Sequence, residues 1–197
     1  MDTPLQTVTP FQRYLEKLLD RYKGTVEGKV ADYIPELSRA RPEWFGIALA
    51  TADGHVYQVG DAHQPFTIQS ISKVIAYGLA LEDNGIDAVT ARVGVEPSGD
   101  VFNAIDLDPD TGQPCNPMIN AGAIATSGMI RDADGVSRVQ RVLDTMQRYV
   151  GHPVTFDEKV YRSESETGHR NRAIAHLLRN FDILEEHPDE TLGLYFR

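Results

Sequence analysis

The sequence is poor in cysteine, in basic residues and in long apolar runs, and each scarcity excludes a class of protein. Cys115 is the single cysteine in 197 residues, which excludes an internal disulfide framework. The sequence has 19 Lys and Arg against 29 Asp and Glu, so its net charge is -10. This acidic balance argues against binding to nucleic acid or to an anionic membrane, which both need a basic surface. No uninterrupted apolar stretch nears the roughly 20 residues of a membrane-spanning helix. We therefore expect a small-molecule partner.

The amino-terminal residues have neither the basic segment nor the apolar segment of a secretory signal. We therefore expect the protein in the cytoplasm. A length of 197 residues with 41% hydrophobic content is enough for one sizeable core or two small ones. Without repeats or Gly/Ser linkers, the expected division is a helix-and-hairpin part, residues 1–65, and a helical part, residues 66–197.

The hydrophobic pattern changes from a strand pair to helices along the chain. Thr9 and the apolar spacing after Pro10 predict a first helix that ends before Gly24, with a capping box at its start. Alternation over residues 45–51 and 55–59, around an Asp-Gly turn, predicts an antiparallel hairpin. Helical spacing then predicts a largely buried helix from Ser70 to about residue 84 and further helices over 136–150 and 171–178. This order indicates the α+β class.

Ser70 and Lys73 form a Ser-x-x-Lys pair at the start of a predicted helix. Three residues make about one helical turn, so both side chains share a face. A serine hydroxyl needs a base to become nucleophilic, and a lysine serves as base when burial lowers its pKa. The unpaired N-H groups of a helix start also suit a developing oxyanion. The alternative is an ordinary helix start with a solvated lysine.

Two asparagines, Asn116 and Asn120, precede a run of small residues that reads as another helix start. Asparagine in this position is commonly a helix cap. A buried asparagine also offers a donor and an acceptor together, which suits an amide or amino-acid ligand. The spacing alone leaves both interpretations open.

The other polar clusters predict no metal and no cofactor. The acidic segment 106–112 begins like a calcium loop, but its glycine falls one position late and Pro117 replaces the closing glutamate. The six histidines stand singly, without metal-ligand spacing. The segment 185–190 reads as a solvated loop. The composition does not decide whether Glu164 is a surface charge or a site residue.

Four strings, in this order, resemble the serine-dependent glutaminase family. The similarity runs from about residue 11 to the end, and four matches together are far more specific than the Ser-x-x-Lys pair. The strings are Tyr33-Ile34-Pro35-Glu36-Leu37, Phe66-Thr67-Ile68-Gln69-Ser70-Ile71-Ser72-Lys73, Asn116-Pro117-Met118-Ile119-Asn120-Ala121-Gly122-Ala123-Ile124 and Ser163-Glu164-Ser165-Glu166-Thr167-Gly168-His169-Arg170-Asn171.

The resemblance implies hydrolysis of L-glutamine to L-glutamate and ammonia, on a β-lactamase/transpeptidase-like scaffold. It makes Ser70 the nucleophile, Lys73 its base and Tyr33 an active-site tyrosine. It also implies a homo-oligomer, a dimer or a tetramer. The substrate-binding positions that it implies, besides Ser70, are Asn120, Glu164, Asn171 and Tyr195.

Family members continue past Arg197, and the resemblance places a second active-site tyrosine, an oxyanion N-H and the remaining strands there. We therefore expect a partial domain, and the alternative function is a non-catalytic glutamine-binding or interaction fragment. A β-lactam-reactive protein is the other acyl-serine interpretation. Its Ser-Asp-Asn, Tyr-x-Asn and Lys-Thr-Gly strings do not occur in the sequence.

Overall fold

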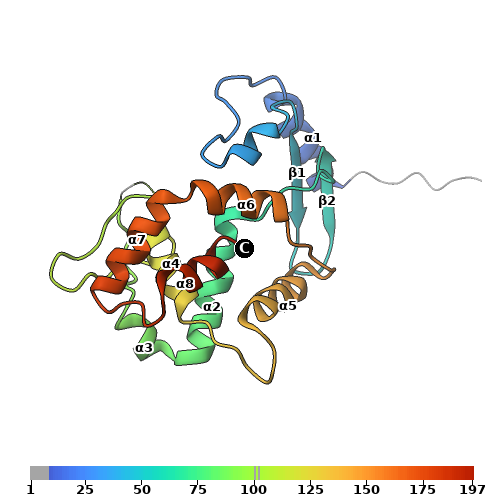
Figure 1. Cartoon of the computed structure of the whole chain (residues 1–197). Coiled ribbons are helices and arrows are strands. Elements are labelled where there is room, and N and C mark those ends of the chain that lie inside the picture. Colours follow the sequence, from blue (N-terminus) through green and yellow to red (C-terminus); the bar gives the residue numbers. More distant parts are fainter. Residues whose placement is uncertain (1–8, 100, 102) are drawn as a thin grey trace, which may run out of the picture. The chain divides into compact units, whose positions relative to one another are not determined.

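The computed structural model describes residues 9–99, 101 and 103–197, which fall into two compact units, Met1–Thr67 and Ile68–Arg197 (Figure 1). Each unit is described by itself. Among the described residues, no helix has the length and hydropathy needed to cross a membrane. The elements are α1 (Pro10–Tyr22), η1 (Pro35–Arg39), β1 (Gly46–Ala50), β2 (Val56–Gly60), η2 (Gln69–Ile71), α2 (Ser72–Asn84), α3 (Ile86–Thr90), α4 (Asn120–Gly128), α5 (Arg138–Val150), α6 (Glu158–Thr167), α7 (His169–Asn180) and α8 (Pro188–Tyr195).

The first helix begins where the sequence predicts. The Thr9 hydroxyl oxygen accepts the Gln12 N-H at 3.2 Å, and Pro10 occupies the first helical position. The predicted capping box is half formed, because the Gln12 side chain donates to the Glu16 carboxylate and to the Gln58 carbonyl instead of returning to Thr9. The contact with Gln58 joins α1 to β2, against which the helix packs (Figure 1).

The predicted hairpin is confirmed as an antiparallel pair in which Gly46 lies opposite Gly60. Its side chains alternate between two faces, as strand geometry requires. Val59 is buried, and Ile47 and Leu49 are half-buried, whereas the intervening residues are exposed. One face of the sheet is therefore covered.

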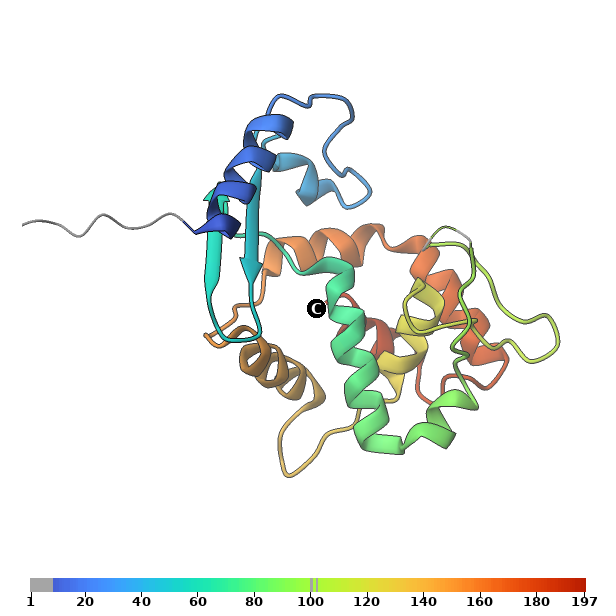
Figure 2. The ribbon, with the colours of Figure 1, turned by 180° about the vertical axis from the view of Figure 1, so that it is seen from behind.

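The second unit is built around α4, a buried helix of small residues that contacts α2, α7 and α8 (Figure 2). Small side chains let neighbouring elements approach closely. A Cβ atom on Gly128 would lie 2.7 Å from Leu184 Cδ2, and one on Gly122 would meet backbone. The hydroxyl groups of Thr126 and Ser127 donate to the Ala123 carbonyl, so these polar atoms are satisfied inside the core.

The apolar residues around α4 form one cluster. They come from α4 itself, α7, α8 and the segments between helices, and include Val93, Ile119, Ala121, Ile124, Ala125, Ile174, Ala175, Leu178, Ile183, Leu184, Leu192 and Phe196. The helices predicted over 136–150 and 171–178 are confirmed as α5 and α7, and α5 ends at Gly151 with a φ of 76°. These elements complete the predicted α+β class.

The predicted burial of the helix after Ser70 is wrong in part. Ser70 belongs to the 3-10 turn η2, and the α-helix begins two residues later. Leu79 is buried as expected, but Ile71 and Val74 are 60% and 61% exposed. Apolar residues surround most of α2, so their spacing does not select the buried side.

The segment 185–190 is not the predicted solvated loop. Both oxygens of the half-buried Glu186 carboxylate accept from Arg138 Nη1 at 2.8 Å, and one also accepts the Thr191 hydroxyl at 2.6 Å. The chain then enters α8 at Pro188. Arg138 lies 48 residues before Glu186, and a local charge pattern cannot reveal such a partner.

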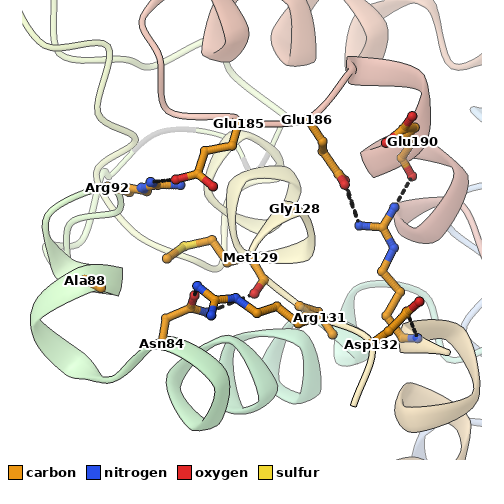
Figure 3. Close-up of a pocket in the computed structure, with 12 residues that line it drawn as sticks. Asn84, Ala88, Arg92, Gly128, Met129, Arg131, Asp132, Glu185, Glu186 and Glu190 are labelled. Atoms are coloured by element: carbon orange, nitrogen blue, oxygen red, sulfur yellow. Dashed lines mark hydrogen bonds and ion pairs between the residues drawn. The ribbon is translucent and has the colours of Figure 1, made fainter. Parts of the chain in front are cut away.

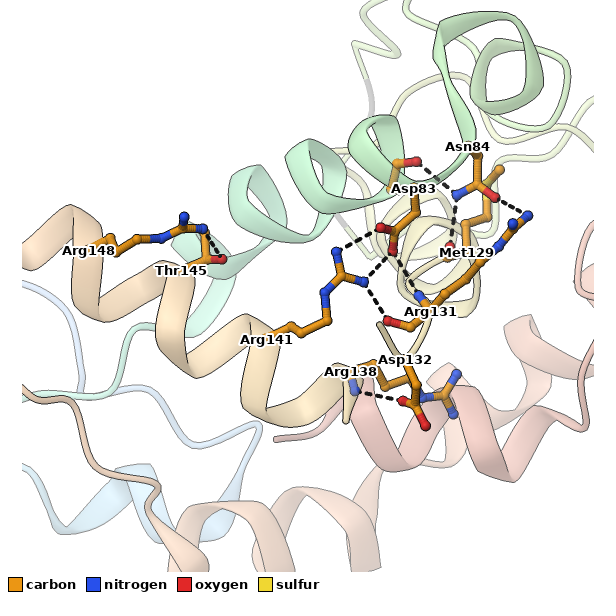
Figure 4. A network of polar contacts seen from close by, with 10 residues as sticks. Asp83, Asn84, Met129, Arg131, Asp132, Arg138, Arg141, Thr145 and Arg148 are labelled. Atoms are coloured by element: carbon orange, nitrogen blue, oxygen red, sulfur yellow. Dashed lines mark hydrogen bonds and ion pairs between the residues drawn. The ribbon is translucent and has the colours of Figure 1, made fainter. Parts of the chain in front are cut away.

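A polar network ties the end of α2 to α5 (Figure 4). Asp83 accepts from both terminal nitrogens of Arg141 at 2.7 Å and from the Arg131 N-H at 2.8 Å. The hydrogen bond from Arg141 is the main reason that the pKa of Asp83 lies below its ordinary value. Because both side chains are largely buried, at 16% and 10% exposure, the pair is shielded from water.

Replacement of Arg141 should therefore destabilise the protein. We expect Arg141→Met to lower the free energy of unfolding by about 3 kcal/mol, since it leaves a buried carboxylate without its main partner. Urea denaturation measures the change. Asp83→Ala with Arg141→Met should cost clearly less than the sum of the two single changes, and strictly additive costs would contradict coupling of the pair.

Candidate active site

The predicted nucleophile lies in a tight turn that leads into α2. Ser70 is exposed in the centre of η2, and Lys73 follows three residues later in the first turn of α2. Gln69 has a φ of +46°, in the left-handed region that non-glycine residues seldom occupy. Its carbonyl accepts the Ser72 hydroxyl at 2.7 Å, which closes the turn around Ser70.

Lys73 is buried, and its ammonium group donates to neutral oxygens of Asn120 and Met118. Only 4% of the residue is exposed. Its Nζ donates to Asn120 Oδ1 at 2.8 Å and to the Met118 carbonyl at 3.0 Å. Burial lowers the pKa of Lys73 to about 8, and the nearby negative charge of Glu164 partly opposes this shift. The lysine can therefore lose its proton near neutral pH, as a general base must.

Glu164 is the acidic counterpart of this lysine. It lies on α6, whose first turn is capped by the Asp157 carboxylate. Burial raises the pKa of Glu164 to about 7, and the positive charge of Lys73 partly opposes the rise. The two groups thus influence each other electrostatically in a site that is partly removed from water, where charges interact more strongly than in bulk solvent.

Asn120 connects Lys73 to Asn171. Its Nδ2 donates to Asn171 Oδ1 at 3.1 Å, while its Oδ1 accepts from Lys73. A lysine has donors only, so the orientation of both amides follows from Lys73. The structure thus brings three predicted site residues from α2, α4 and α7 into one chain of hydrogen bonds. Asn120 is neither only a cap nor a solvated residue, since it is 8% exposed.

The two predicted tyrosines are not members of this chain of hydrogen bonds as it is described above. Tyr195 ends α8, where it is half-buried against the central cluster and its ring lies 5.7 Å from that of Phe196. Tyr33 belongs to the first unit. The roles of both residues stay predictions.

Sequence reasoning missed two contributors to the site. The Met118 carbonyl holds Lys73, and a backbone acceptor leaves no signal in side-chain identity. Helix α6, which carries Glu164, was also not predicted. The signal that could have found it is Asp157, whose carboxylate accepts the N-H groups of Lys159 and Val160.

A hollow of about 540 Å³ lies near the other end of α4, by Gly128 and Met129 (Figure 3). Two of the arginines that line it form ion pairs with glutamates of the same lining. Arg92 is paired with Glu185, and Arg138 with Glu186. Since α4 has nine residues, Gly128 is separated from Asn120 by about 12 Å along the helix. The hollow therefore lies away from Lys73 and is lined in part by ion pairs.

Comparisons with known proteins identify the family of the chain. The Glutaminase family profile matches residues 28–197. A glutaminase of Nostoc sp. is 54% identical over 189 residues, which cover 96% of this chain and 57% of that protein. The structure of the probable glutaminase YbaS has a TM-score of 0.87 at 37% identity, covering 94% of this chain and 60% of that one.

A third similarity is to the structure of Mglu in its glutamate form, with a TM-score of 0.87 and 38% identity. It covers 95% of this chain and 43% of Mglu. The chain therefore spans about half the length of the proteins that it matches. The family profile extends over most of the chain, and the solved neighbours share its fold at well over 30% identity. The chain belongs to the glutaminase family.

Proposed function

We propose that the whole protein hydrolyses L-glutamine to L-glutamate and ammonia through a seryl acyl-enzyme. The observation that carries the proposal is the buried Lys73, with a pKa of about 8, one helical turn after Ser70. Family membership supports the substrate, as does the glutamate form of Mglu. The predicted alternative, a non-catalytic glutamine-binding or interaction fragment, differs by binding glutamine without turnover.

In the proposed reaction, Ser70 Oγ attacks the carboxamide carbon of glutamine while neutral Lys73 accepts the hydroxyl proton. The Ser70 N-H is one donor to the oxyanion. Lys73 then returns the proton to the departing nitrogen, so that ammonia leaves and a seryl ester remains. Water attacks the ester, and release of glutamate restores the serine. The steps need no metal and no cofactor.

We propose that the remaining site residues bind the substrate. Glu164 pairs with the α-ammonium group, as a half-buried carboxylate can. Because Asn120 Nδ2 already donates to Asn171 Oδ1, the Nδ2 group of Asn171 is the suitable donor to the substrate carboxylate. A catalytic role for Tyr33 and a substrate-binding role for Tyr195 are further proposals, which rest on the resemblance to the family.

The proposal also covers the organisation of the protein. We propose that the parts predicted as 1–65 and 66–197 belong to one glutaminase domain, since a single family profile, over residues 28–197, includes residues of both. A cytoplasmic location and a dimer or tetramer are the accompanying proposals. Sedimentation of the protein completed to family length measures its oligomeric state.

The direct test is ammonia release from glutamine by this 197-residue chain and by the same chain joined to the remaining part of the Nostoc relative. We expect turnover by the joined protein. Glutamine binding measured by calorimetry without ammonia release in either protein would support the alternative function. Turnover of asparagine instead of glutamine would contradict the proposed substrate.

The charge of Glu164 predicts how glutamine binding depends on pH. With a pKa of about 7, the carboxylate is mostly protonated at pH 6 and mostly ionised at pH 8. We expect the affinity to rise about tenfold over this range, because only the ionised form attracts the ammonium group. Glu164→Gln should weaken binding at pH 8 by about 1.5 to 3 kcal/mol and remove the pH dependence. Calorimetric titration measures both effects.

The matched control is Glu166→Gln, which changes an exposed glutamate on the same helix. It should leave both the affinity and its pH dependence unchanged. A Glu164→Gln protein that keeps full affinity but loses turnover would show that Glu164 acts in the chemical step and not in binding.

A further inference from the structure

The second acceptor of Lys73 is a backbone carbonyl, so its position depends on the segment that carries it. Met118 precedes α4 by two residues, in the connection that follows Asn116. Its carbonyl oxygen lies 3.0 Å from Lys73 Nζ, while its own side chain is 41% exposed. The side chain of Met118 therefore contributes little to fixing the carbonyl.

Asn116 holds this segment from the side. Its Oδ1 accepts the N-H of Met118 at 2.9 Å and the N-H of Ile119 at 3.2 Å, the two amides that flank the Met118 carbonyl. Its Nδ2 donates to the Glu96 carbonyl at 2.8 Å. The Asn116 amide thus uses both of its ends. It restrains the peptide group that accepts from Lys73 at that group's own N-H, from Ile119, and at the preceding N-H, from Met118.

The backbone of Asn116 is also pressed against α4. A Cβ atom on Gly122 would lie 1.9 Å from the Asn116 carbonyl oxygen and 2.7 Å from its carbonyl carbon. Only glycine permits this approach. The segment therefore has a fixed place against the same helix that supplies Asn120, the other acceptor of Lys73.

We propose that Asn116 is a positioning residue for Lys73, acting through the Met118 carbonyl. The inference rests on the proposed role of Lys73 as the base. Both acceptors are neutral oxygens, so they direct the ammonium group without adding a full negative charge beside it. The negative charge of Glu164 also acts on Lys73 and raises its pKa, although burial lowers it more. Asn116 thus orients the Lys73 side chain without adding a negative charge that would raise the pKa of its ammonium group.

The test follows the titration of Lys73 directly, by NMR of the lysine 13Cε-1Hε signals in the 197-residue chain. The sequence has five lysines, and Lys73→Met assigns the signal. We expect Asn116→Ala to lower the midpoint by about 0.5 to 1 pH unit, because the still-buried ammonium group loses a fixed acceptor. Asn116→Ser keeps an oxygen that can accept the Met118 N-H and should restore most of the midpoint.

Asn84→Ala is the matched control. This asparagine also binds two carbonyls, those of Ala80 and Met129 at 2.8 Å, but at the other end of α4. It should lower the thermal stability without moving the Lys73 midpoint. Gly122→Ala displaces the Asn116 backbone by a second route and should lower the midpoint in the same direction.

An unchanged midpoint in a folded Asn116→Ala protein would overturn the inference. A rise toward the ordinary lysine value would also overturn it, since Asn116 would then exclude water instead of aiming the carbonyl. If Asn116→Ala does not fold, the Lys73 midpoints of the Asn116→Ser and Gly122→Ala proteins provide the same test. None of these readouts needs glutamine turnover, so failure of the proposed hydrolysis leaves the test intact.

Discussion

Ser70→Ala should reduce ammonia release from glutamine by about a thousandfold or more, because nucleophilic residues of this kind contribute at least that much. The change removes the hydroxyl and leaves the surrounding turn in place. Glutamine binding should therefore persist. A coupled assay for ammonia, run on the chain completed to family length, measures the loss, and calorimetry measures the binding.

The neighbouring hydroxyl provides the control for this experiment. Ser72 Oγ donates to the Gln69 carbonyl and has no proposed role in bond formation. We expect Ser72→Ala to lower turnover far less than Ser70→Ala does. Equal losses in the two proteins would mean that the shape of the turn, and not the Ser70 nucleophile, accounts for the effect.

Lys73→Met should abolish turnover and at the same time stabilise the fold. At pH 7 the buried ammonium group is charged in both the folded and the unfolded chain, and burial opposes its charge only in the folded chain. A pKa lowered from 10.5 to about 8 corresponds to at most about 3 kcal/mol, from which the loss of two hydrogen bonds subtracts. We expect a net gain of about 1 to 2 kcal/mol in the free energy of unfolding.

The pH dependence distinguishes this cause from simple repacking. Between pH 8 and 10.5 the unfolded chain keeps the Lys73 proton longer than the folded chain does, so the stability of the unchanged protein should rise with pH. The advantage of Lys73→Met should shrink over the same range. Lys73→Arg should stay inactive, because a guanidinium group remains protonated. An active arginine protein would point to another base.

Most of the local structure could be predicted from the sequence, because it depends on neighbouring residues. The Thr9 cap fixes the start of α1, Gly151 ends α5, and the alternation around an Asp-Gly turn fixes the hairpin. What could not be predicted depends on distant partners. Arg138 forms an ion pair with Glu186, which is therefore half-buried and not part of the solvated loop that the sequence predicts.

The candidate site divides in the same way. Lys73, Asn120 and Asn171, which the structure joins, lie in three of the strings that resemble the family. Their connections were not predictable, because Asn120 meets residues 47 positions before it and 51 positions after it in the chain. The Met118 carbonyl was beyond prediction for a different reason, since any residue at that position supplies one. Folding, not local sequence, therefore converts a set of polar residues into an ordered hydrogen-bond chain.

The backbone at Gln69 shows what the fold gives up to hold its serine. A φ of +46° costs a non-glycine residue roughly 1 kcal/mol, and glycine would remove that cost. Glycine would also give the unfolded chain and the turn more conformations, and Ser70 would sample several directions. Gln69 therefore lowers the thermodynamic stability of the fold slightly, but it restricts Ser70 to a narrow range of orientations. The turn is rigid although its backbone is strained.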